Sequence, residues 1–145
     1  MDNILRFLDA CGVFYLATCE GGQAKVRPMN FARNVNGKLG FYTSKQKDLY
    51  RQLARNPLAE IAAAGPGGWI RIRGRMSFCD APEVFALWAA EAEFFRFADA
   101  DRVACCFDGA VAEFMPGYQV PLPDFVATWE RAVMPEGEVR YTGAL

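Results

Sequence analysis

The cationic side chains of this 145-residue chain are concentrated in its middle part, where they could bind an anion. Residues 24–76 contain eleven of the sixteen Lys and Arg residues but only two acids, which gives this segment a net charge of +9. The whole chain has a net charge of -1, because residues 77–145 carry four Arg and twelve acids. Charge alone leaves two explanations open: the basic segment faces an anionic ligand, or the acidic part folds back and neutralises it.

The residue types also exclude several kinds of catalysis. The chain has no histidine, so it cannot use a Ser-His-Asp or Cys-His mechanism or offer imidazole to zinc or haem. Its five cysteines form no C-x-x-C pair, and we expect reduced, mostly buried thiols. The acids fall in apparently solvated stretches such as residues 98–102. We therefore predict no metal site and no catalytic side chain.

The pattern of apolar residues predicts a single, mainly β domain over residues 1–145. A first helix should end at Gly12, and alternating residues predict strands at 13–20 and 24–33. Asn36-Gly37 predicts a hairpin turn into a third strand. We expect these three strands to follow one another as an antiparallel meander.

The segment GFYTSKQKDLYRQL (residues 40–53) runs from that third strand into an amphipathic helix, which Asn56-Pro57 should end. Beyond it the sequence predicts a hairpin whose second arm is cationic on one face, then a helix and two further strands. These elements are expected at residues 58–65, 69–78, 80–93, 102–107 and 110–115. From about residue 116 we expect an irregular or helical tail, with a possible helix at 124–133, that wraps the domain or contacts a partner.

The order of these elements favours a small closed barrel with helices over its gaps. With 52% hydrophobic residues but no apolar run near the ~20 residues of a membrane span, the chain reads as soluble and globular. The first residues, Met1-Asp2-Asn3, do not form a secretory signal. We therefore expect a cytoplasmic protein with no membrane partner.

Four segments carry a family resemblance: VFYLAT (13–18), VRPM (26–29), GKLGFYTSKQKDLYRQLARNP (37–57) and WIRIRG (69–74). In this order and spacing they resemble the pyridoxamine 5'-phosphate oxidase-like FMN-binding split barrels, over about residues 4–80. The resemblance implies a split β-barrel of antiparallel strands with short helices over the barrel ends. It also implies a homodimer that binds FMN between its subunits.

The resemblance further implies the residues that bind FMN. Arg27 and Lys47 match positions that bind the phosphate, whose charge of nearly -2 suits lysines beside a helix N-terminus. Trp69 matches a position that approaches the flavin from the second subunit, although it could equally be an interface or core aromatic. The other implied residues lie along the isoalloxazine and ribityl chain, match the family's Tyr-Thr pair, or add a hydroxyl; they are Pro28, Met29, Asn30, Tyr42, Thr43 and Ser44.

The chain lacks the C-terminal Trp and Arg-His elements that bind substrate in true pyridoxamine 5'-phosphate oxidases, so we do not expect vitamin B6 oxidation. The missing histidine also argues against the haem-handling relatives. We expect an FMN-dependent oxidoreductase that uses a nicotinamide donor or another small molecule, with the flavin carrying the chemistry. The alternatives are a flavin-binding protein for storage or sensing, a deazaflavin or other phosphorylated ligand, and a nucleic-acid-binding barrel. In the last, Phe31, Phe41, Tyr42 and Trp69 would form a stacking platform; we do not expect nucleic acid as the partner.

Overall fold

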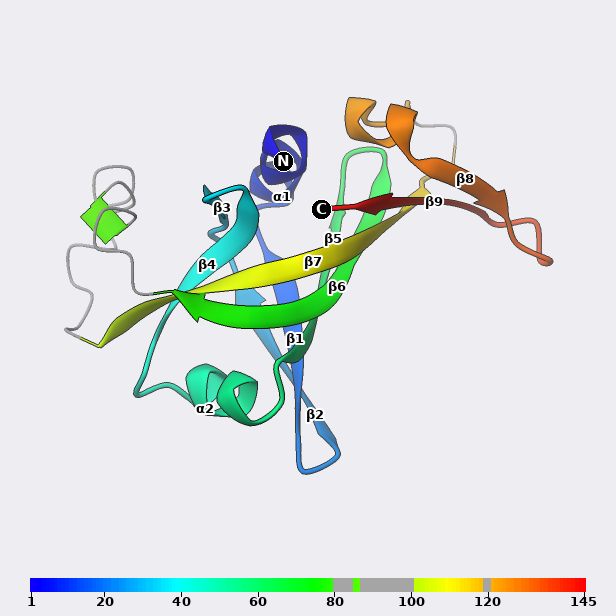
Figure 1. Cartoon of the computed structure of the whole chain (residues 1–145). Helices are drawn as coiled ribbons and strands as arrows, with labels where there is room; N and C mark the ends of the chain where they lie inside the picture. The colour runs from blue at the N-terminus through cyan, green and yellow to red at the C-terminus, as the bar shows by residue number, and fades with distance from the viewer. Residues whose placement is uncertain (80–84, 87–100, 119–120) are drawn as a thin grey trace.

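A curved antiparallel sheet organises the protein, whose computed structural model describes residues 1–79, 85–86, 101–118 and 121–145 (Figure 1). Two α-helices accompany the sheet in the described part of the chain: α1 (Asp2–Cys11) and α2 (Asp48–Arg55). The nine strands are β1 (Phe14–Glu20), β2 (Gln23–Met29), β3 (Arg33–Val35), β4 (Lys38–Ser44), β5 (Leu58–Gly65), β6 (Gly68–Cys79), β7 (Arg102–Pro116), β8 (Glu130–Val133) and β9 (Val139–Ala144).

The strands lie in the order β2-β1-β5-β6-β7-β4-β3, and β9 pairs with the C-terminal half of β7 and with β8. All these pairs are antiparallel. The fold is thus mainly β with short helices, as expected for a split barrel. The more specific prediction of a closed barrel is wrong, because β2 and β3 end the sheet on opposite sides and do not pair with each other.

The predicted three-strand meander is also wrong, because β2 pairs with neither β3 nor β4. β2 ends at Met29, and the chain then leaves the sheet before β3 begins at Arg33. Pro28 has no amide hydrogen, which suits the edge position that β2 occupies next to β1. The predicted hairpin at Asn36-Gly37 is confirmed: both residues have positive φ, 51° and 84°, as a tight turn between β3 and β4 requires.

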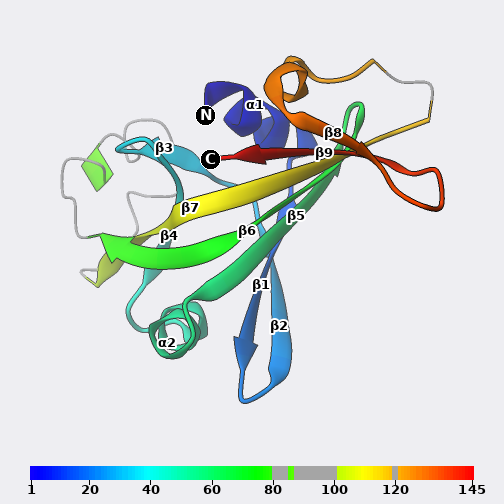
Figure 2. The same cartoon turned by 45° about the vertical axis from the view of Figure 1, so that its right-hand side comes forward.

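The core lies between the sheet and the two helices, which cover opposite ends of the curved sheet (Figures 1 and 2). Helix α1 buries Ile4, Phe7 and Leu8, and α2 buries Leu49 and Leu53 in the same cluster. Strand β6 alternates as predicted: its isoleucines are fully buried, whereas its arginines point to the outer face.

The C-terminal part differs from its prediction in two ways. The two expected strands at 102–107 and 110–115 are one continuous strand, β7, with a bulge where Gly109 adopts a φ of +65°. The tail is not an irregular or helical arm: after the 3-10 helix η2 (Asp124–Thr128) it forms β8 and β9. β9 pairs with β7 over Val111–Phe114. Because all but the last of its residues are half-buried, β9 lacks the alternation that reveals a strand.

The helix predicted at 80–93 lies outside the described residues except for residues 85 and 86, which are helical. Of the helices that the structure describes, none has the length and apolar character needed to cross a membrane.

Candidate functional site

The open seam of the sheet contains a cavity of about 430 Å³, formed where β2, β4 and the start of α2 meet. We call it the seam cavity; its lining residues are Arg27, Pro28, Met29, Tyr42, Thr43, Gln46, Lys47, Asp48 and Leu49. β2 and β4 lie far apart in the strand order, so the curvature of the sheet brings their edges together here. The volume is within the range of small-molecule sites.

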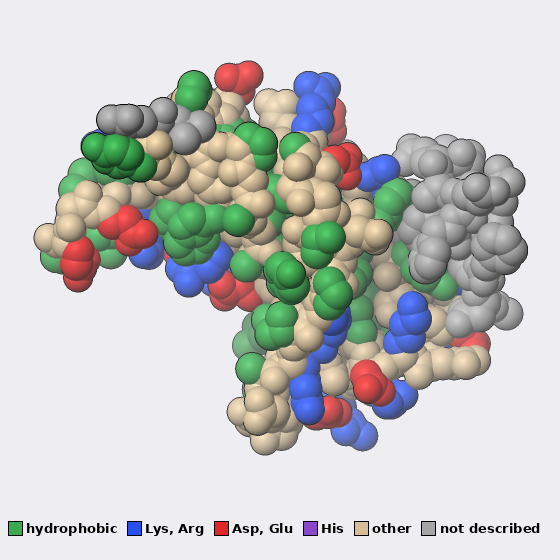
Figure 3. Space-filling model, turned by 180° about the vertical axis from the view of Figure 1, so that it is seen from behind, with side chains coloured by type: hydrophobic (Ala, Val, Ile, Leu, Met, Phe, Trp, Pro, Cys, Tyr) green, Lys and Arg blue, Asp and Glu red, His purple; other side chains and the backbone are tan. Residues whose placement is uncertain are grey.

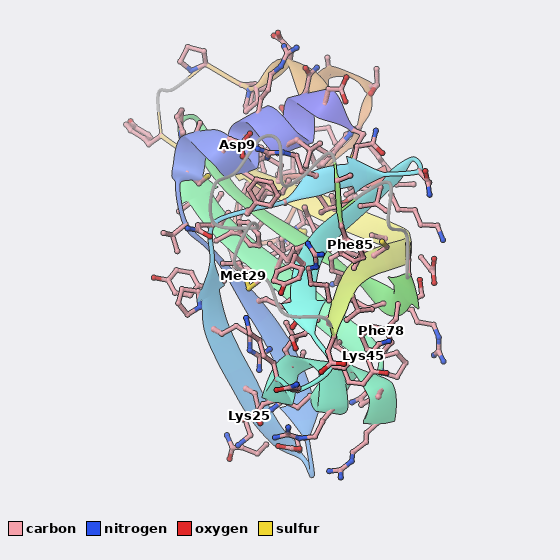
Figure 4. The ribbon with its side chains drawn as sticks, turned by 90° about the vertical axis from the view of Figure 1, so that its left-hand side faces the viewer. Asp9, Lys25, Met29, Lys45, Phe78 and Phe85 are labelled. Carbon is pink, nitrogen blue, oxygen red and sulfur yellow. The ribbon has the colours of Figure 1, made fainter. Side chains whose placement is uncertain are left out.

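Six of the nine predicted cofactor residues line this cavity: Arg27, Pro28, Met29, Tyr42, Thr43 and Lys47. In Figure 4, Met29 lies on β2 between the levels of α1 and α2, and Lys45 lies close to the start of α2. The structure therefore brings together residues that are up to twenty positions apart in the sequence. Their assignment to a cofactor stays a prediction.

Arg27 is held from the inner side of the seam by two buried polar side chains. Its Nη1 donates to Thr18 Oγ1 at 2.9 Å and to the Leu16 carbonyl at 3.4 Å, and its Nη2 donates to Gln52 Oε1 at 2.6 Å. Burial lowers the pKa of the guanidinium, and the nearby charge of Asp48 opposes this shift. An arginine stays charged under such a shift, so Arg27 brings a fixed positive charge to the cavity.

Thr43 adds a buried hydroxyl to the same cavity. Its side chain is 1% exposed, and its Oγ1 has no hydrogen-bond partner among the residues that the structure describes. An unsatisfied buried hydroxyl is costly, and such atoms are uncommon in folded proteins. A ligand oxygen bound in the cavity would give this hydroxyl its partner.

Lys47 immediately precedes α2 and contributes the second cation. Its Nζ lies 5.7 Å from the centre of the Tyr42 ring, and within the described part of the chain it makes no ion pair. The first amides of α2 also have no acceptor within the helix, which favours an anion at this end. Asp48 opposes this tendency, although its carboxylate pairs with Arg51.

The remaining predicted residues lie outside the seam cavity. Ser44 is buried, and its Oγ accepts a hydrogen bond from the Gln46 amide at 3.2 Å, so it supports the turn before α2. Asn30 is exposed in the link after β2. Trp69 is 39% exposed on β6, with the Arg71 guanidinium 5.6 Å from its ring centre. Within one chain Trp69 does not reach the cavity, and its approach from a second subunit stays a prediction.

Thr18 and Gln52 are not among the site residues predicted from the sequence, although both leave a signal in the pattern. Gln52 lies three residues after Leu49 and next to Leu53, on the apolar face of α2. Thr18 follows Phe14 and Leu16 on the buried side of β1. A polar residue at a predicted core position has to find a polar partner, which here is the Arg27 guanidinium.

Some cations of the basic segment pair with acids of the C-terminal part, and others do not. Two arginines of β6 pair with the acidic part: Glu113 accepts from Arg71 at 2.6 Å and lies 3.1 Å from Arg73, and it also lies 3.9 Å from Arg140. Arg27 and Lys47, in contrast, form no ion pair with any described acid. Two cations of the basic segment that form no ion pair with a described acid, Arg27 and Lys47, therefore line the seam cavity.

The cavity has no group of metal ligands, since no cluster of three His, Cys, Asp or Glu residues occurs among the residues that the structure covers. The nucleic-acid platform is also incomplete, because Phe41 is fully buried in the core. What the arrangement can do is bind an anion with two cations and a hydroxyl, beside the apolar surfaces of Pro28, Met29 and Leu49.

Comparison with known proteins gives matches to a family and to solved structures. The family model described as Pyridoxamine 5'-phosphate oxidase matches residues 1–114. A NimC/NimA family protein from Clostridium acetobutylicum is 32% identical, with a TM-score of 0.73 over 79% of this chain and 86% of that chain. No curated protein sequence matches the chain.

Two more distant structures show the same fold. A pyridoxamine 5'-phosphate oxidase-related, FMN binding protein from Nostoc punctiforme is 15% identical, with a TM-score of 0.58 over 93% of this chain and 87% of that chain. PhzG from Burkholderia lata, solved in complex with tetrahydrophenazine-1-carboxylic acid, is 15% identical, with a TM-score of 0.64 over 99% of this chain and 85% of that chain. At this identity the likeness concerns the fold alone.

Proposed function

The chain belongs to the pyridoxamine 5'-phosphate oxidase-like family, and we propose that it is an oxidoreductase that binds FMN in the seam cavity. The observation that carries the proposal is the composition of that cavity. It combines two cations that are not paired with acids and one buried hydroxyl without a partner, all counted over the described residues. These groups suit a phosphate monoester, which carries close to two negative charges at neutral pH.

In this proposal Arg27 and Lys47 bind the phosphate, and Thr43 donates its hydroxyl hydrogen to a ligand oxygen. Pro28, Met29 and Tyr42 provide the apolar surface for the ribityl chain and ring, and Asn30 follows Met29 outside the cavity. Bound FMN would supply the transfer of a hydride or of single electrons. The two cations of the cavity are suited to holding an anion, so the protein contributes binding, orientation and exclusion of water.

We also propose that two chains associate through the outer face of β1, β2 and β5. Large apolar side chains are exposed there: Val26 is 64% exposed, Leu58 59% and Tyr15 53%. Figure 3 shows hydrophobic side chains gathered along the β1–β2 hairpin on this side of the molecule. Several large exposed apolar side chains on one face of a sheet are typical of protein interfaces. A dimer would also allow Trp69 of one chain to approach the cavity of the other.

The dimer is tested by sedimentation equilibrium of the parent and of Val26→Glu. Val26 points to the outer face, opposite to its neighbour Arg27, so the variant should give monomers without removing a cavity residue. A parent protein that is monomeric with stoichiometric FMN would contradict the proposed interface.

The FMN proposal is tested by the visible spectrum of the freshly purified protein, followed by chromatography of the ligand released on denaturation. We expect FMN, and we expect NADH or NADPH to bleach the bound flavin under anaerobic conditions. Bound FMN that no nicotinamide nucleotide or other small-molecule donor reduces would favour storage or sensing. A released deazaflavin would replace FMN as the cofactor, and a protein that binds no flavin would contradict the proposal.

A further inference from the structure

Thr18, Arg27 and Gln52 form a hydrogen-bonded triangle beneath the seam cavity. Thr18 Oγ1 donates to Gln52 Oε1 at 2.7 Å, and both oxygens accept from the guanidinium of Arg27, at 2.9 and 2.6 Å. Both supporting side chains are buried, each with 4% exposure. The Gln52 amide is oriented from its other side, because its Nε2 lies 3.5 Å from Glu20 Oε2.

The triangle determines which edge of the guanidinium remains available. An arginine has five N–H donors in a fixed plane. Thr18 Oγ1 and Gln52 Oε1 lie 2.7 Å apart and bind one terminal nitrogen each, so they occupy the edge between Nη1 and Nη2. The other Nη1 hydrogen is directed to the Leu16 carbonyl. Among the described residues, the Nε hydrogen and the second Nη2 hydrogen have no acceptor.

We propose that Thr18 and Gln52 are positioning residues, which hold Arg27 so that its Nε–Nη2 edge binds two oxygens of the phosphate group. This inference rests on the proposed binding of FMN in the seam cavity. Two parallel N–H donors match the geometry of a phosphate, and a guanidinium held in advance loses less freedom on binding.

Gln52 has a second consequence for the site, because it belongs to α2, the helix that Lys47 precedes. Its bond to Arg27 ties this helix to the edge strand β2, although no backbone pairing joins the two elements. One side chain therefore links Arg27 directly to the helix that Lys47 precedes. We infer that Gln52 contributes to phosphate binding without touching the ligand.

The test compares the affinities for FMN and riboflavin, measured by fluorescence-quench titration of apoprotein. Gln52→Met keeps the volume of the side chain but removes both polar atoms, and Thr18→Val removes only the hydroxyl. Both variants should lower the affinity for FMN roughly 10-fold and leave the affinity for riboflavin nearly unchanged. A loss of this size is typical when a residue that orients a metal ligand is removed. Thr18→Ser retains the hydroxyl and should bind both ligands as the parent does.

A double-mutant cycle distinguishes positioning from an independent effect. In the Arg27→Ala background, Gln52→Met should cause no further loss of FMN affinity, because its partner is already gone. An equal selective loss in both backgrounds would overturn the inference, as would parent-like binding by Gln52→Met and Thr18→Val. Thermal unfolding of every variant shows whether it is folded, and the Thr18→Val and Thr18→Ser pair gives the answer if Gln52→Met is not.

The failure of the proposed function has a different signature. If Arg27→Ala weakens FMN and riboflavin equally, Arg27 does not bind the phosphate and the site itself is misplaced, which also overturns the inference. If Arg27→Ala lowers the affinity for FMN alone while the Thr18 and Gln52 variants do not, the site is correct and only the positioning role is contradicted.

Discussion

Replacing Lys47 by alanine should lower the affinity for FMN about 10-fold and leave the affinity for riboflavin nearly unchanged. A hydrogen bond to a charged group contributes about 1.5–3 kcal/mol, and we expect the lower end because water can replace an exposed ammonium. A loss of about 1.5 kcal/mol corresponds to roughly 10-fold in affinity. The fold should tolerate the change, since within the described part of the chain Lys47 contacts the Tyr42 ring but forms no ion pair.

The assay is a fluorescence-quench titration of parent and variant with FMN and riboflavin at two salt concentrations. Added salt should weaken FMN binding less in Lys47→Ala than in the parent, because one screened attraction is missing. Lys38→Ala is the matched control: this lysine is also exposed, pairs with Asp108 and begins β4 at the end remote from the seam cavity. Three results would contradict a phosphate-binding role for Lys47: an unchanged FMN affinity in Lys47→Ala, an equal loss of riboflavin affinity in that variant, or an equal loss of FMN affinity in Lys38→Ala.

Three other changes have predicted outcomes. Asp48→Asn should strengthen FMN binding several-fold in the same titration, because it removes the acid that lines the seam cavity; weaker binding would contradict this. Burial opposes ionisation of Glu113, but the hydrogen bond from Arg71 and the charges of Arg73 and Arg140 hold its pKa below the usual 4.5. The folded state therefore gains stability above pH 4.5 that is lost as the pH falls through the lowered pKa. Glu113→Gln should cost about 1–3 kcal/mol at pH 7 and flatten the acid side of the stability profile, measured by urea unfolding; an unchanged profile would contradict it. Gly68→Ala should destabilise by more than about 2 kcal/mol in the same assay, because Gly68 has a φ of +148° and a Cβ would lie 2.1 Å from the Met115 carbonyl oxygen. Gly137→Ala, with positive φ but open space, should cost only about 1 kcal/mol, and an equal cost at both sites would contradict the steric argument.

Local patterns predicted the helices, strands and turns well where neighbouring residues alone determine the structure. Asn36-Gly37 specifies a tight turn by its backbone preferences, and Leu49 and Leu53 specify the buried side of α2. The alternation of β6 likewise separates its buried isoleucines from its arginines. These features required no knowledge of distant residues.

The predictions failed where pairing with a distant strand replaces the local signal. β9 is a strand because it pairs with β7, and Gly143 within it lies against the Trp129 indole, where a Cβ would come within 2.5 Å of the ring. The prediction of a closed barrel was wrong because β1 pairs with β5 and β4 pairs with β7. This strand order leaves β2 and β3 at opposite edges of the sheet. No alternation of apolar residues encodes which strands become neighbours.

The amino-acid sequence alone predicts the chemical groups of the candidate site and the strand or helix beside which each one lies. It placed Arg27 on a strand beside Pro28, the Tyr42-Thr43 pair on another strand, and Lys47 before a helix, because each of these depends on neighbouring residues alone. The folded arrangement of the sheet brings these groups into one cavity and places Arg71 and Arg73 of β6 beside Glu113. It also places Thr18 and Gln52 where both accept hydrogen bonds from Arg27. The reason is that charge pairing and hydrogen bonding depend on separations of a few ångströms in space, and the curvature of the sheet sets these separations between residues far apart in the chain.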